Sequence, residues 1–410
     1  MNFDTKNING IFVFLLFSTV FVFWTVGLVW VLSLYSIGVL IKSKKVIKQK
    51  VLSADFKTHI MPLVLILISG FLFLNMVVRD GYDINRLGLA LGLLFAVPIY
   101  YNIVIYGISE KLVVYSLYAV SIVGGLAGLY EYFVLYNKRV GTIFSAMVFG
   151  LIGSLLVSIL MIRIVTQYHQ LNRNQLILTI TSLVFAVSIL LVSNSRSAYL
   201  FLVLFLIFIF FYIGAWRIKR YLVSFSLIFF LIIASTFVFK ESIIVKRFST
   251  AILTSQAYLS GNSDIKSSST IRFEMWMAGF SAFKLNPVFG VGDVKAVDVI
   301  SQISKDRNYH KSITGERHLH SDYFNALARF GLVGLFLYLS VYLVALYNIH
   351  RARVLSVSAK LSCFSYVIGY LVFGLTTTNY SYVLSQILIF VGIPMLVAWI
   401  KHLEMESETS

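Results

Sequence analysis

The sequence has little charge, little proline and almost no cysteine. Only 12% of its 410 residues are charged, whereas a soluble domain carries about 25%, so a soluble globular enzyme and a disordered chain are both excluded. The single cysteine, Cys363, excludes an intrachain disulfide and a multi-cysteine metal site. What the chain has is apolar residues, which make up 59% of it. Apolar runs of about 18 or more residues recur along nearly its whole length, and each can cross a ~30 Å hydrocarbon core. The sequence therefore predicts a polytopic membrane protein.

The apolar runs are expected to be helices, because they are long and show no alternation of apolar and polar residues. The predicted spans lie at 61–78, 87–107, 112–136, 139–162, 175–193, 197–215, 221–239, 326–347, 361–377 and 382–400. The first run, 11–41, would be ~46 Å long as one helix, so we favour a helical hairpin that breaks near Thr25 to Gly27. The prediction is an all-α integral membrane bundle of about 12 spans, or about 11 if the first run is one tilted helix.

Basic residues outnumber acidic ones, with 34 Lys and Arg against 17 Asp and Glu. They sit in short loops between apolar spans, so the expected partners are membrane lipids and no nucleic acid is expected. The basic clusters at 42–57, 217–220 and 351–360 fall on one side of the bundle, which the positive-inside rule makes cytoplasmic. We therefore expect one integral domain in three parts. These are the N-terminal transmembrane helices (1–239), a large periplasmic loop with short helices (240–325), and the C-terminal helices with a cytoplasmic tail (326–410).

The large loop changes character along its length. Residues 254–270 are rich in Ser, Gly and Asn, whereas 271–285 are expected to be helical and to end at Asn286 and Pro287. The glycine-rich run 290–293 is predicted to be a turn. Because it follows no strand, it does not indicate a nucleotide site.

The polar functional groups are expected at the outer face. The middles of the predicted spans contain no Asp, Glu, Lys, Arg or His, which disfavours an ion-coupled transporter. Arg196 lies in a short polar break between two spans, Arg272 begins the helix of the loop, and His318 and His320 close the loop. Either arginine could instead anchor to lipid headgroups. The two histidines have no third ligand at convincing spacing, so no metal site is predicted.

The strongest local pattern runs from His320 and Ser321 to Gly331 and Gly334. Ser321 or Asp322 is a good N-cap for the following helix. The positive end of that helix would face outward beside His320 and favour an anion such as a lipid diphosphate. Gly331 and Gly334 would let another helix approach closely. An ordinary capped helix with a small-residue packing face has the same pattern.

This spacing, H-S-x9-G-x-x-G, resembles the motif of the O-antigen ligase family. The family consists of integral membrane glycosyltransferases related to O-antigen polymerases and protein O-oligosaccharyltransferases. Three further features fit, at 195–197 (SRS), at 271–276 leading to 286–292 (NPVFGVG), and at 318–321 (HLHS). Two features depart from the pattern. Ser321 stands where Asn is common, and Leu335 and Phe336 stand where many ligases have a Thr pair.

The resemblance implies transfer of O-antigen from undecaprenyl diphosphate to lipid A–core, at the periplasmic face of a Gram-negative inner membrane. Arg196 and Arg272 are then expected to bind the diphosphate, because the guanidinium group donates two hydrogen bonds and stays charged. No cofactor is expected, because two arginines and a helix N-terminus can replace a divalent metal. The alternatives are an O-antigen polymerase of the same superfamily and a non-enzymatic flippase for lipid-linked glycan.

The same resemblance makes His320 the expected catalytic base, because a histidine with a pKa near ~6.5 can take the proton of an acceptor hydroxyl. Asp322 is the competing base, and His320 could instead be a diphosphate ligand. His318, Ser321 and Asp322 are further candidates for substrate binding, and Gly331 and Gly334 for a structural role.

Overall fold

The computed structural model describes residues 4–18, 25–51, 55–80, 84–137, 139–142, 145–213, 268–379 and 382–409, together with Leu253 and Gln256. Within these residues the chain is helical and has no strand. Eight of the described helices are long and apolar enough to cross a membrane. A ninth results if α2 (Thr25–Lys42) and α3 (Lys44–Lys50), bent by 88°, form one broken span. A polytopic helical membrane protein is thus confirmed. The span expected at 221–239 lies outside the described residues.

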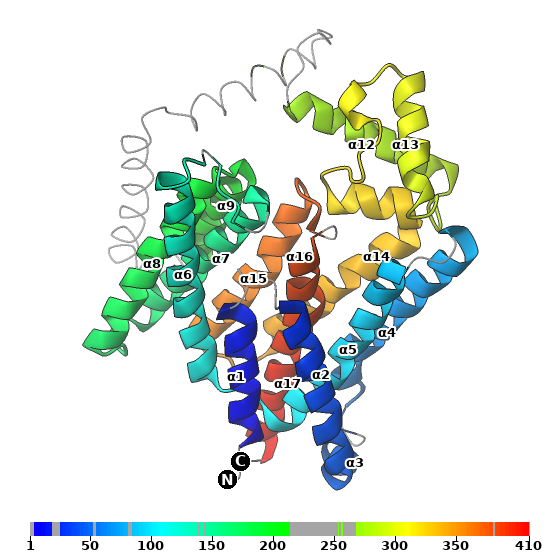
Figure 1. Ribbon diagram of the computed structural model, residues 1–410. Coiled ribbons are helices and arrows are strands. Elements are labelled where there is room, and N and C mark those ends of the chain that lie inside the picture. Colours follow the sequence, from blue (N-terminus) through cyan, green and yellow to red (C-terminus); the bar gives the residue numbers. More distant parts are fainter. Residues whose placement is uncertain are drawn as a thin grey trace.

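The first apolar run forms two helices in contact, α1 (Thr5–Ser18) and α2. The break expected near Thr25 to Gly27 is not found at those residues, because they form the first turn of α2. Figure 1 shows α1 and α2 beside each other at the end of the molecule that holds both termini. The next elements are α4 (Phe56–Asn75), the π-helix η1 (Met76–Asp80), α5 (Ile84–Tyr106) and α6 (Glu110–Phe133).

Three further helices follow, namely α7 (Ala146–Gln167), α8 (Arg173–Ser193) and α9 (Arg196–Ile213). α7 begins later than the expected start at 139. Two local contacts explain the difference. The N–H of Val140 donates to the carbonyl of Val192 at the end of α8 (3.0 Å), and the Ser145 hydroxyl caps α7 by accepting from the N–H of Val148 (3.3 Å).

The C-terminal part is built around α14 (Asp322–Arg351), which contacts α4, α12, α15 and α17. Its neighbours in the chain are α15 (Val357–Gly374), α16 (Val383–Ile387), the π-helix η5 (Leu388–Gly392) and α17 (Ile393–Thr409). Val341, Tyr342 and Ala345 of α14 are fully buried in the main apolar core. α14 is therefore the central helix of this half.

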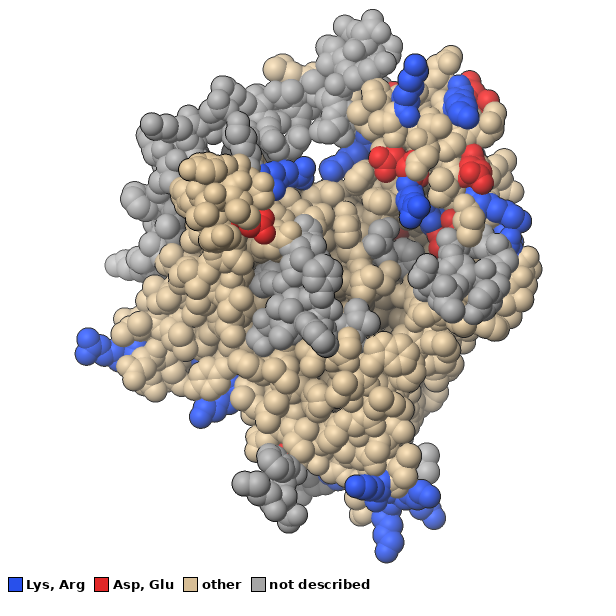
Figure 2. Space-filling model, in the orientation of Figure 1, with Lys and Arg blue, Asp and Glu red and all other residues tan. Residues whose placement is uncertain are grey.

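The loop helices are α12 (Ser268–Leu285), α13 (Lys295–Asp306) and the 3-10 turn η3 (Lys311–Ile313). They lie at the end of the molecule away from the two termini (Figure 1) and have an apolar core of their own. The helix expected at 271–285 is confirmed, and it ends before Pro287 as predicted. In Figure 2 the charged side chains of the described residues gather toward the two ends of the molecule, and an uncharged band lies between them.

Candidate functional site

The start of α14 is the meeting point of the candidate residues. Ser321 occupies the N-cap position, as predicted, but its hydroxyl does not cap the helix. It donates instead to the carbonyl of Gly374 at the end of α15 (3.2 Å). The hydroxyl therefore links α14 to α15.

α14 is kinked at Gly331, where the backbone has φ 66° and ψ −160°. Four backbone hydrogen bonds join the two sides of this kink to the turn at 286–292. The N–H groups of 332 and 333 donate to the carbonyls of 287 and 288, and those of 291 and 292 donate to the carbonyls of 328 and 329, at 2.9–3.1 Å. The NPVFGVG run thus docks directly onto α14.

This docking corrects the expected role of Gly331. A Cβ atom at Gly331 would overlap the carbonyl of Val288 and the amide nitrogen of Gly290, so the close neighbour is the turn and not another helix. Gly334 has a Cβ position that faces the Phe330 side chain and, at 3.4 Å, the ring of Phe71 on α4. Only Gly334 therefore faces a neighbouring helix, as expected.

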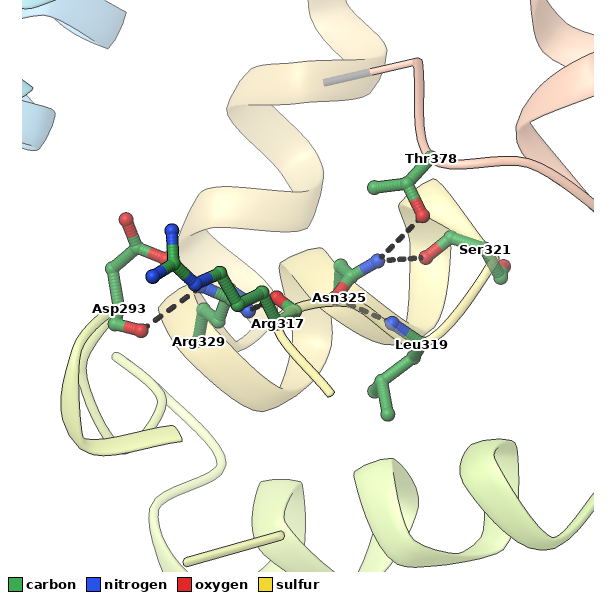
Figure 3. Close-up of polar contacts among 7 residues, drawn as sticks. All are labelled: Asp293, Arg317, Leu319, Ser321, Asn325, Arg329 and Thr378. Atoms are coloured by element: carbon green, nitrogen blue, oxygen red, sulfur yellow. Dashed lines mark hydrogen bonds and ion pairs between the residues drawn. The ribbon is translucent and has the colours of Figure 1, made fainter. Parts of the chain in front are cut away.

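A buried arginine of α14 strengthens the contact between this helix and the turn at 286–292. Arg329 is 8% exposed; it forms an ion pair with Asp293 and also donates to the backbone carbonyl of Arg317 (Figure 3). This side chain connects the turn with the beginning of the histidine segment. The sequence pattern placed Arg329 at a span end and gave no signal for this contact.

His318 and His320 lie together in the segment 317–321 before α14. Their ring centroids are 5.4 Å apart with an interplanar angle of 67°, and the His318 ring is 6.5 Å from that of Tyr382. Both histidines are half-buried. The structure thus brings the two expected histidines into one ring cluster.

Both imidazoles have lowered pKa values. Burial lowers the pKa of His320 to about 4, and the positive charges of Arg272 and His318 add to the effect. Burial also lowers the pKa of His318, against the opposing charge of Glu316. His320 is therefore neutral at pH 7 and has a ring nitrogen free of a proton.

The two arginines that were expected at the site are Arg272 and Arg196. Arg272 is a half-buried residue of α12 whose charge acts on His320, and its Nη2 lies 3.8 Å from the sulfur of Met147 on α7. Arg196 is the first residue of α9, and its side chain lies outside the described part of the structure. Its neighbour Ser197 forms a 2.7 Å hydrogen bond with Thr376.

Asp322 is buried, with an exposed fraction of 2%. Its Oδ2 accepts hydrogen bonds from the hydroxyl of Tyr338 (2.8 Å) and from the amide of Asn379 (3.0 Å). Two donors thus stabilise the carboxylate inside the bundle, and one of its oxygens is occupied.

A polar run after α15 completes the arrangement, and sequence reasoning missed it. Four consecutive side chains, 376–379 (TTTN), contact the starts of three helices: Thr376 bonds to Ser197 of α9, Thr377 contacts the sulfur of Met147 on α7 (3.8 Å), and Thr378 and Asn379 bond to residues of α14. The run straddles the end of the span expected at 361–377, so its hydroxyls were counted within an apolar helix. Four polar residues in succession at a span end were the available signal.

These features define a polytopic helical membrane protein with a cluster of basic and hydroxyl side chains where several helices begin. The segment that carries most of this cluster, residues 181–339, matches the family model described as O-antigen ligase. This match confirms the resemblance to the O-antigen ligase family that the motif of this segment indicates. The match does not distinguish ligases from polymerases within the superfamily. No curated protein matches the sequence.

Proposed function

We propose that the protein is an O-antigen ligase, which transfers O-antigen from undecaprenyl diphosphate to lipid A–core at the periplasmic face of the inner membrane. The observation that carries this proposal is that Arg272 of α12 lies where its charge acts on His320, just before α14. The guanidinium is close enough to the imidazole to lower its pKa. A permanent cation beside a neutral base suits a reaction in which an acceptor loses a proton and a leaving group gains negative charge.

In the proposed reaction, an acceptor hydroxyl oxygen attacks the anomeric carbon of the donor glycan. The bond from that carbon to the diphosphate oxygen breaks, and the hydroxyl proton passes to His320. The departing lipid diphosphate retains the bond electrons, and Arg272, with Arg196 as the second expected arginine, stabilises its charge. The first N–H groups of α14 favour the same anion.

Donor binding would also tune the base. An imidazole with a pKa of about 4 is a weak proton acceptor at neutral pH. A diphosphate bound to Arg272 adds negative charge beside His320, and negative charge stabilises the imidazolium. His320 would therefore become a stronger base when the donor is in place, which couples proton removal to donor binding.

Asp322 is the alternative base. Its Oδ2 already accepts from Tyr338 and Asn379. These bonds support a role for Asp322 in fixing the start of α14.

Transfer by the purified protein tests the proposal, with lipid-linked O-antigen as donor and lipid A–core as acceptor. His320→Ala is expected to lower turnover by ~10²–10⁴-fold, whereas His318→Ala should lose less. His310→Ala is the matched control, because His310 caps the short turn η3 and bonds to Ser312 within the same loop. Substantial transfer by His320→Ala, with loss of transfer by Asp322→Asn, would make the aspartate the base. If His320→Ala weakens donor binding as much as turnover, the histidine is a diphosphate ligand.

Two cellular experiments test the finer points. Deletion of a ligase leaves lipid A–core without O-antigen, deletion of a polymerase leaves a single-unit cap, and deletion of a flippase strands lipid-linked units on the cytoplasmic leaflet.

For topology, Asn308→Cys on a Cys363→Ser background should react with an impermeant maleimide in cells with a permeabilised outer membrane, whereas Ser43→Cys should not. Labelling of Ser43→Cys under these conditions would reverse the proposed orientation.

A further inference from the structure

We infer that Asn325 is a positioning residue that fixes His320 by bonding the backbone on both sides of it. This inference deepens the proposed function and rests on it for the catalytic role of His320. The geometry itself is independent of that role.

Asn325 lies one turn into α14 and is 2% exposed. Its Oδ1 accepts from the N–H of Leu319 (3.2 Å), and its Nδ2 donates to the carbonyl of Ser321 (2.8 Å). Leu319 and Ser321 are the residues immediately before and after His320. One side-chain amide therefore bonds the backbone on both sides of the histidine, and Figure 3 shows its bonds to Leu319 and Ser321.

The bracketed residue needs such support. His320 has a φ of 51°, in the left-handed region that a residue with a Cβ adopts only at an energetic cost. A conformation of this kind persists only where surrounding contacts over-determine it. The two bonds from Asn325 hold the N–H of Leu319 and the carbonyl of Ser321, one peptide group further out on each side of this unfavourable φ.

Other contacts hold the same segment from different directions. Trp276 of α12 donates from Nε1 to the carbonyl of Leu319 (3.1 Å), and Thr378 accepts from the Asn325 amide (3.3 Å). The carbonyl of Arg317 accepts from Arg329. The backbone is thus fastened at 317, 319 and 321, and the alternate residues, His318 and His320, carry the rings.

Because α14 is fixed by the main core, the bonds from Asn325 hold the backbone around His320 in a fixed position relative to this helix. Loss of the amide would let residues 319–321 relax toward an ordinary φ and carry the imidazole away from Arg272. A shift of about 1 Å in a reacting group can cost ~10²-fold in rate. The substrate need not bind more weakly, because Asn325 is buried and acts through the backbone.

The experiment has a kinetic readout and a geometric one. For Asn325→Ala we expect kcat to fall about 10–100-fold while KM for the lipid-linked donor changes little. Asn325→Asp keeps an acceptor for the N–H of Leu319 and should lose less; it replaces Asn325→Ala in every comparison if that variant does not yield stable protein. Asn348→Ala is the matched control, because this asparagine of α14 is also buried and, among the described residues, its side chain bonds to the Val344 carbonyl of its own helix. It should retain wild-type kcat.

The geometric readout is the pH dependence of diethylpyrocarbonate modification at His320, followed by peptide mass mapping. The groups that act on this imidazole are Arg272 of α12 and His318 of its own segment. In Asn325→Ala the modification profile should move upward, from about 4 toward the ordinary histidine value of ~6.5, as the ring leaves its half-buried place beside Arg272. Asn348→Ala should keep the wild-type profile.

The outcomes distinguish the positioning of His320 by Asn325 from the catalytic role of His320. A shifted profile with reduced kcat supports both. A shifted profile with unchanged kcat supports the positioning by Asn325 and refutes the catalytic role of His320. An unshifted profile in the Asn325 variant overturns the inference, whether or not kcat falls.

Discussion

The joint between the turn at 286–292 and the kink in α14 makes a quantitative prediction for Gly331→Ala. Alanine at this position must adopt a φ of 66°, at a cost of roughly 1–3 kcal/mol. Its Cβ would also overlap the carbonyl of Val288, so the turn must move and lengthen some of the four backbone hydrogen bonds that hold it. At about 1 kcal/mol for each bond lost, we expect a total destabilisation of about 3 kcal/mol.

The measurement is thermal unfolding in detergent, alongside a matched glycine substitution. Gly70 lies inside α4, and a Cβ there has no atom within 4 Å. Gly70→Ala should therefore be neutral or stabilising by about 0.5–1 kcal/mol. Gly331→Ala should melt at a clearly lower temperature than the wild type and also lose transfer activity. Equal melting temperatures for the two variants would show that the turn does not dock on α14 as described.

Three further predictions follow from the site. In kcat/KM the limb that rises with pH through the pKa of His320, about 4, should move to higher pH in Arg272→Gln, because the lost cation no longer disfavours the imidazolium; a profile that stays in place contradicts this electrostatic link. Arg329→Met should destabilise the protein by about 3–5 kcal/mol, because it leaves the charge of Asp293 buried without this arginine, and adding Asp293→Asn should restore part of the loss in a denaturation assay. Transfer should continue in EDTA, because the candidate donors to the diphosphate are arginines; complete loss that Mg²⁺ or Mn²⁺ restores would refute this.

The sequence predicted the elements whose causes are local. Hydropathy located the described spans, and Pro287 correctly indicated the end of α12, because a proline interrupts a helix through its own ring and missing N–H. The motif also directed attention to His320. The preference of serine and aspartate for the N-cap position indicated Ser321 or Asp322 as the cap, and Ser321 occupies that position.

What escaped prediction depends on contacts between distant segments. The kink at Gly331 exists because residues 286–292 dock there, and an i, i+3 glycine pair is equally typical of helix packing. The bond from Ser321 to Gly374 replaces the expected cap because α15 ends beside it. The polarity of the run at 376–379 was visible in the sequence, but its contacts could not be predicted, because its partners on α7, α9 and α14 are far away in sequence.

The position of these partners in the chain has a consequence for biosynthesis. The loop helices, the turn and both histidines emerge from the ribosome before α14, and α14 emerges before the residues at 374–379 that bond to Ser321, Asn325 and Asp322. The histidine segment therefore gains its last supports only after α15 has been synthesised. A nascent chain halted before residue 374 would carry every histidine and arginine of the motif and still lack a completed site.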